Sequence, residues 1–121
     1  MSYDLPLVQT YTLPNSAIDT ATVKLRVIGP AGLRGRLESI GAVITADTTD
    51  AASVVQVGTA ATADAFGTLS VPVASAGAST NAAVILTDDD NFMAADTVVE
   101  IASDGGSTAG DADLTVTIAW F

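Results

Sequence analysis

The sequence predicts an all-β protein, namely an antiparallel β-sandwich or barrel, jelly-roll-like, with seven to eight short strands. Three observations support this prediction. Apolar and polar residues alternate in several short segments, and Gly, Pro, Asp, Asn and Ser stand between those segments. No apolar residues recur at helical spacing over eleven or more positions, so at most a single helical turn is expected, over 62–66 or 89–94. A chain of 121 residues forms one domain.

The N-terminal part, residues 1–16, is predicted to be an extended arm, followed by a sandwich domain over 17–121. Pro6 and Pro14 fix φ and disfavour a helix around them. The segment 7–13 between them is rich in strand formers. It is expected to be either an edge strand or an arm exchanged with a neighbouring chain.

Alternation begins clearly at residue 21. Val23, Leu25 and Val27 take one face of a strand, and Lys24 and Arg26 take the other. A Gly-Pro-Ala-Gly turn follows at 29–32, and a second strand begins after it.

The second strand changes phase along its length. Leu33 and Leu37 occupy odd positions, whereas Ile40 and Ile44 occupy even ones. Gly41 lies near the change, so a β-bulge is predicted there.

Further strands are predicted over 53–57, 68–73, 82–87, 96–102 and 114–120. In the strand over 68–73, Leu69, Val71 and Val73 are expected to face inward, and the outward Pro72 marks an edge strand. In the last strand, Leu114, Val116, Ile118 and Trp120 share the inward face. Trp120 is expected to fill the core, or alternatively to anchor a subunit interface together with Phe121.

Charge is strongly segregated. All four basic residues lie within thirteen positions, and the 85 residues after Arg36 carry twelve acids and no Lys, Arg or His. A net charge of −10 argues against nucleic-acid binding, which needs a broad basic surface. With no His, no Cys and one Lys, the chain lacks the usual groups for proton transfer and nucleophilic attack, so we expect no enzyme activity and no cofactor.

The basic residues are one candidate binding site. Lys24 and Arg26 should project from one face of their strand, and Arg34 and Arg36 from one face of the next. If these two strands pair as a hairpin, the four charges form a single patch suited to an acidic partner surface. Alternatively, they only solvate an outer face.

Two acidic loops are candidate ligand sites. The run Asp88-Asp89-Asp90 offers oxygen ligands for a calcium ion, with Asp96, but it lacks the Gly and Glu of an EF-hand loop, and a solvated loop that uses Asp and Asn for turn chemistry is the favoured interpretation. The Gly-rich segment 104–113 contains three Asp and no Lys, which argues against phosphate binding and favours a flexible hairpin connection.

The N-terminal sequence has neither the basic nor the apolar region of a signal peptide, and no apolar run reaches the length of a membrane span. We therefore expect a protein made in a cytoplasm, with no membrane partner.

In these features the chain resembles the head decoration, or cement, proteins of tailed bacteriophages. The resemblance covers most of the chain in small residues, short strands and acidic loops, and its segments are 5–11, 35–43, 55–59, 95–99 and 109–121. It implies a virion protein on the capsid exterior that binds the major capsid protein, forms a homo-oligomer, most often a trimer, and bridges neighbouring capsomers.

Under this resemblance, Leu7, Val8 and Tyr11 are the expected contacts of the arm, and Lys24, Arg26, Arg34 and Arg36 are the expected polar contacts. Two alternatives remain open from the residues alone. One is a ligand-binding sandwich for carbohydrate or cell-surface attachment, calcium-dependent through Asp88 to Asp90. The other is a phage tail component.

Overall fold

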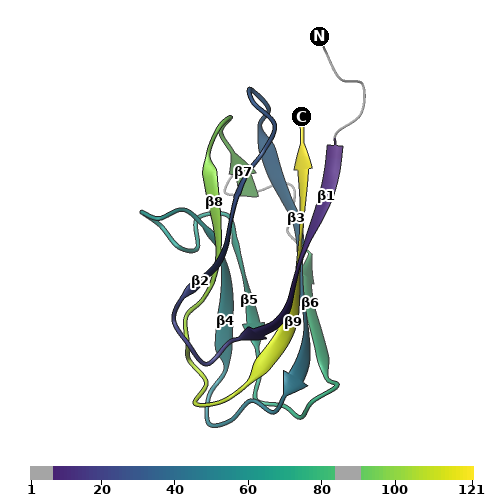
Figure 1. The fold of residues 1–121 in the computed structure, drawn as a ribbon, viewed down its shortest axis with the longest axis vertical. Coiled ribbons are helices and arrows are strands. Elements are labelled where there is room, and N and C mark those ends of the chain that lie inside the picture. Colours follow the sequence, from purple (N-terminus) through teal and green to yellow (C-terminus); the bar gives the residue numbers. More distant parts are fainter. Residues whose placement is uncertain (1–6, 84–90) are drawn as a thin grey trace.

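The computed structural model describes residues 7–83 and 91–121, which form two antiparallel sheets packed face to face (Figure 1). Sheet A contains, in spatial order, β1 (Leu7–Ala17), β9 (Asp111–Trp120), β3 (Gly35–Ala46) and β6 (Ser79–Ala83), and the short β7 (Phe92–Met93) also pairs with β3. Sheet B contains, in spatial order, β2 (Val23–Ile28), β8 (Val98–Ser103), β4 (Ser53–Gly58) and β5 (Gly67–Val71). Within these ranges no helix is long and apolar enough to cross a membrane.

The strand order confirms the predicted jelly roll. With β7 set aside, β1-β9-β3-β6 faces β2-β8-β4-β5, and the chain crosses repeatedly from one sheet to the other. The described residues contain nine strands rather than seven or eight. The additional strand, β7, lies where a helical turn was expected over 89–94. Residues 84–90 lie outside the described residues; they include most of the predicted strand 82–87 and the start of that turn.

The N-terminal segment is an edge strand of sheet A in this structure. β1 pairs with β9 from Leu7 opposite Trp120 to Leu13 opposite Leu114, without a register shift. It continues past Pro14 to Ala17 after an irregularity between Leu13 and Ser16. Leu13 belongs to the core, so β1 is packed into the sandwich.

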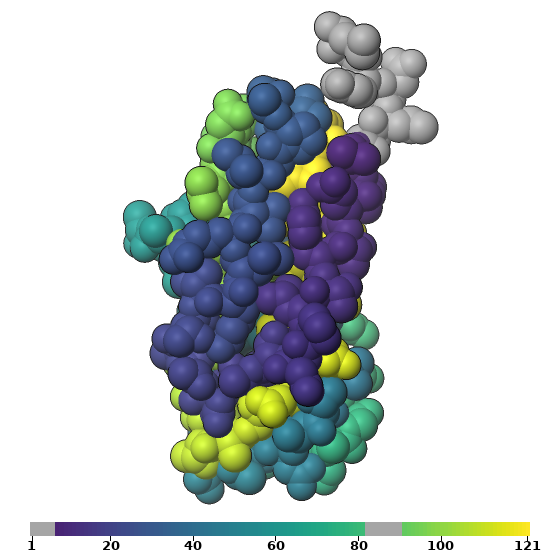
Figure 2. Space-filling view, viewed as in Figure 1, coloured from purple at the N-terminus to yellow at the C-terminus, as the bar shows by residue number. Residues whose placement is uncertain are grey.

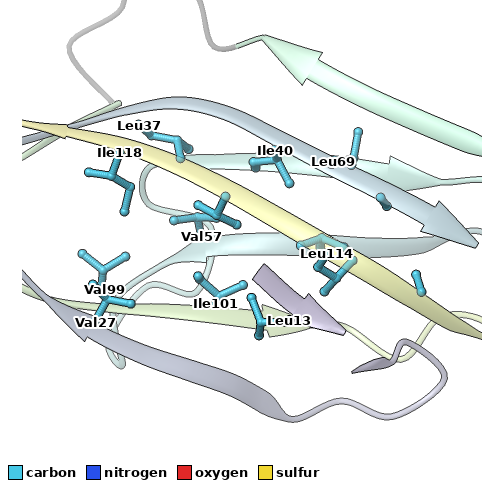
Figure 3. Close-up of a cluster of buried hydrophobic side chains, with 14 of the residues drawn as sticks. Leu13, Val27, Leu37, Ile40, Val57, Leu69, Val99, Ile101, Leu114 and Ile118 are labelled. Carbon is cyan, nitrogen blue, oxygen red and sulfur yellow. The ribbon is translucent and has the colours of Figure 1, made fainter. Parts of the chain in front are cut away.

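The core consists mainly of branched aliphatic side chains from both sheets (Figure 3). Leu114, Val116 and Ile118 are fully buried, as the alternation of the last strand predicts. Leu69 and Val71 of β5 are also buried, and β5 is an edge strand as Pro72 indicated. The prediction for Val73 was wrong: it is 52% exposed, because the strand ends before Pro72.

The bulge in β3 lies earlier than predicted. The register against β9 shifts between Leu37 and Ser39, which allows Leu37 and Ile40, three positions apart, both to face the core. Gly41 serves another purpose. A Cβ atom there would lie 2.7 Å from the side-chain oxygens of Asn81 and Thr115, so a larger residue would require these side chains to move.

One end of the sandwich, the tryptophan end, is closed by an aromatic ring. Trp120 is only 2% exposed, and its Nε1 donates to Gln9 Oε1 at 3.1 Å and to Tyr11 Oη at 3.3 Å. The backbones of Gly29 and Gly35 approach the ring so closely that a Cβ atom at Gly35 would lie 2.7 Å from it. The sequence prediction that Trp120 fills the core is confirmed.

The opposite end, the serine end, is closed by buried polar groups. Ser53 Oγ and Ser103 Oγ donate to the carbonyl oxygen of Ile18 at 2.5 and 2.8 Å. Beside them, the exposed Asp104 covers this end from the solvent side, where its Oδ1 accepts from the backbone N–H of Val54 at 2.8 Å. Buried polar groups are tolerated when they are hydrogen-bonded in this way.

Candidate partner-binding surfaces

The four basic residues do not form a single patch, because β2 and β3 do not pair as a hairpin. β2 belongs to sheet B and β3 to sheet A, so the turn at 29–32 carries the chain across the sandwich. Lys24 and Arg26 therefore lie on a different sheet from Arg34 and Arg36. The hairpin interpretation was wrong because Gly-Pro-Ala-Gly is equally compatible with a crossing between sheets.

The two basic residues of β2 are engaged locally. Arg26 Nε lies 2.8 Å from Glu100 Oε2 on the neighbouring strand β8, with the Arg26 side chain 65% exposed. Lys24 Nζ donates to Thr22 Oγ1 at 2.5 Å. The Glu100 side chain is only 12% exposed, but solvent screening at the exposed Arg26 keeps the contribution of this pair to stability small, and the pair also neutralises the charge that a partner would bind.

Arg34 and Arg36 gather around an aromatic side chain. Their guanidinium carbons lie 5.0 and 5.9 Å from the centroid of the Phe121 ring, within the range of cation–π contact. Phe92 meets Phe121 edge to face, with centroids 6.1 Å apart and an interplanar angle of 88°. The backbones of Arg34 and Phe121 hydrogen-bond to each other in both directions at 2.9 Å, which fixes this arrangement.

The two arginines of this cluster differ in their ion pairing among the described residues. Arg36 donates from Nε and Nη2 to Glu38 Oε1 at 2.8 and 2.5 Å, and both side chains are 27% exposed. Within the described ranges, no carboxylate lies within ion-pairing distance of Arg34. Arg34 also lines a shallow, open hollow of about 450 Å³ with Phe92, Met93 and Ala94. Among the described residues, Arg34 is therefore the arginine of the pair that has no carboxylate partner.

The predicted arm residues differ in their exposure to solvent. Leu7 and Val8 are 47% and 55% exposed. Tyr11 is partly buried against the core, and its hydroxyl donates to Gln9 Oε1 at 2.7 Å. Tyr11 thus supports the position of Trp120, whereas Leu7 and Val8 are free surface.

The strand register brings the exposed arm residues and the Arg34 cluster to the same end of sheet A. Val8 lies opposite Ala119, Ala119 opposite Arg36, and Arg36 opposite Phe92. With strands about 4.8 Å apart, this row spans roughly 15 Å. We call this end of sheet A the end patch; Val8, Arg34, Arg36, Phe92 and Phe121 lie on its outer side, and the exposed Leu7 lies at the same edge on the inner side, opposite Trp120.

Sequence reasoning did not find the aromatic part of the end patch. The sequence indicates Phe121 only as an alternative interface anchor beside Trp120, and it indicates no role for Phe92. Their contact with the arginines depends on the pairing of β9 and β7 with β3, which no local pattern in the sequence reveals.

The acidic loops give no metal site in the part of the chain that the structure describes. Asp88 to Asp90 lie outside it, and within 7–83 and 91–121 no three acidic side chains are grouped to hold a metal ion. Asp96 Oδ1 instead accepts from the backbone N–H of Gly32 at 3.2 Å. The Gly-rich segment joins β8 in sheet B to β9 in sheet A, so it is a crossing between sheets and the hairpin prediction was wrong.

Comparison with known proteins adds a fold likeness. No family model matches the chain, and no curated protein matches it. A chain of the solved structure "Cyanophage Pam1 capsid asymmetric unit" aligns with 14% identity and a TM-score of 0.49, covering 99% of this chain and 88% of that one. A likeness at this level assigns no role to the protein described here.

Proposed function

We propose that this protein is a non-enzymatic component of a tailed-phage particle, located on the capsid exterior and made in the host cytoplasm. It would bind the major capsid protein, bridge neighbouring capsomers and so stabilise the shell without any covalent step. The sequence resemblance to decoration proteins motivates this role. The oligomer that the resemblance implies is a trimer.

The observation that carries the proposal is the composition of the end patch. Exposed apolar side chains, two arginines and two phenylalanines lie together on a chain whose net charge is −10. Arg and aromatic residues are enriched in protein interfaces, and binding energy usually concentrates on a few of them. An acidic protein that presents an exposed arginine beside aromatic rings is suited to an acidic partner surface.

The physical mechanism is added interface area. Apolar contact through Leu7, Val8 and the phenylalanines would supply burial, and Arg34 would set orientation through carboxylates of the shell. The acidic remainder of the surface would face solvent and limit non-specific association.

A first experiment asks whether the protein is on the particle. Purified virus particles from the source sample are analysed by quantitative mass spectrometry. We expect this chain in amounts comparable with the major shell protein. Its absence, or only a few copies per particle, would contradict a role on the capsid lattice and favour a tail component or a ligand-binding sandwich.

A second experiment identifies the binding surface. Arg34→Ser is compared with Arg26→Ser in co-sedimentation with shells stripped of the protein. Both variants lose one exposed arginine, but only Arg34 lies in the end patch. We expect affinity to fall about tenfold for Arg34→Ser, a loss of about 1.4 kcal/mol, and to be unchanged for Arg26→Ser. Equal binding by both variants would exclude the end patch as the contact.

A further inference from the structure

The sandwich has four sheet edges, and β1 differs from the other three. Within the described ranges, β2 carries Lys24 and Arg26 together with a register irregularity, β5 is five residues long and followed by Pro72, and β6 is five residues long. Charges, irregularities, proline and short length are the features that prevent edge strands from pairing with other chains.

β1 has none of these features over its first seven residues. It is eleven residues long, and its register against β9 is regular from Leu7 to Leu13. The sequence Leu-Val-Gln-Thr-Tyr-Thr-Leu contains no charged residue and no proline. Figure 2 shows β1 lying along the surface of the molecule. Its outer backbone groups have no partner strand among the described residues, because β1 is the last strand of sheet A.

The same seven residues are nearly symmetric about Thr10. If two copies of β1 pair antiparallel with a two-fold axis at Thr10, Leu7 lies opposite Leu13 and Val8 opposite Thr12 of the second copy. Gln9 then lies opposite Tyr11, and Thr10 opposite its own equivalent. On the inner face Leu7 meets Leu13 and Gln9 meets Tyr11, on the outer face Val8 meets Thr12 and Thr10 meets its equivalent, and no two like charges are opposed.

We propose that β1 pairs with β1 of a second copy of this chain, joining two A sheets into one continuous sheet. Seven residues paired in this way form about six to eight backbone hydrogen bonds. Identical antiparallel strands related by a two-fold axis close the assembly at two chains. The seven paired residues carry no charge themselves, although each copy has a net charge of −10. This inference does not rest on the capsid role, although Leu7 and Val8 also belong to the end patch, and it predicts a dimer, whereas the resemblance implies a trimer.

The mass in solution is the first test. Light scattering of the full chain should give about 24 kDa, twice the 12.1 kDa of one chain. Thr10→Lys places two ammonium groups opposite each other and should raise the dissociation constant by about tenfold or more. Thr115→Lys is the matched control, because Thr115 is exposed on the same face of sheet A but on the inner strand β9; its mass should be unchanged.

The register is tested by crosslinking. The chain has no Cys, so single-cysteine variants give unambiguous products. Thr10→Cys should form a disulfide-linked pair under mild oxidation, since residue 10 faces its own equivalent. Thr12→Cys, two residues away on the same face, should not. A wild-type mass of one chain or of three, or equal crosslinking by the two cysteine variants, would overturn the proposal.

Discussion

The two ends of the sandwich are closed by opposite chemistry. At the tryptophan end, a single buried ring fills the space between the sheets, and glycines allow the backbone to approach it. At the serine end, hydroxyl groups from two strands of sheet B converge on the carbonyl oxygen of Ile18. The comparison teaches that an apolar closure depends on shape, whereas a polar closure depends on having every hydrogen bond made. The two should therefore respond differently to substitution.

The largest effect is expected at the tryptophan end. Trp120→Ala removes the ring and leaves a cavity bordered by Gly29 and Gly35, so the free energy of unfolding should fall by about 4 kcal/mol. Urea denaturation followed by circular dichroism measures this loss, since the variant has no other tryptophan for fluorescence. A loss below about 1 kcal/mol would mean that the ring does not close this end.

The next effect should be cooperative and belongs to the serine end. Ser53→Ala and Ser103→Ala each leave the Ile18 carbonyl with one remaining donor, so each should cost about 1 kcal/mol. The double variant leaves that buried carbonyl without either donor and should cost about 3 kcal/mol, more than the two single losses together. Additive losses in the double-mutant cycle would show that the two hydroxyls do not share this acceptor.

A smaller effect should follow from crowding the tryptophan ring. Gly35→Ala places a methyl group against Trp120 and the Met93 sulfur, and should cost about 2 kcal/mol through overpacking. Because Trp120 is the sole tryptophan, its emission maximum should shift when the ring moves. Gly32→Ala serves as a contrast: no atom lies within 4 Å of the added methyl group, and only the positive φ of 79° opposes it. Its emission should therefore stay that of the wild type.

The smallest effect is expected away from both ends, at the ion pair on the outer face of sheet B. Glu100→Gln removes the charge facing Arg26, whose side chain is 65% exposed, and should change the free energy of unfolding by less than about 1 kcal/mol. Thermal melts at low and high salt provide the measurement. A change as large as that of the serine double variant would place this pair among the main stabilising contacts of the fold.

The regular parts of the fold could be predicted from the sequence because alternation alone determines which face of a strand is buried. Leu114, Val116, Ile118 and Trp120 were assigned inward on that basis, and all four are buried. The position predicted for the bulge in β3 was wrong because it relied on Gly41. That glycine reflects crowding by the side chains of Asn81 and Thr115 on the outer face.

The candidate site could be predicted only in its ingredients. The sequence indicates Arg34 and Arg36 by their charge, and Leu7 and Val8 by their place in the predicted arm, and the structure brings all four to one end of sheet A. The separation of Lys24 and Arg26 onto the other sheet could not be predicted, because residues 29–32 have the same turn chemistry in a hairpin and in a crossing between sheets. Strand order depends on contacts that are remote in sequence.

The position of β9 in the middle of sheet A has a consequence for biosynthesis. β1 and β3 are made early, yet both pair along their length with a strand formed by residues 111–120. During translation, therefore, β1 and β3 cannot be joined into one sheet until β9 has left the ribosome. Until then, the apolar side chains of β1 and β3 remain exposed to solvent. The emerging chain would then be most vulnerable to aggregation just before β9 is released, and a stall at that stage should be more harmful than one at any earlier point.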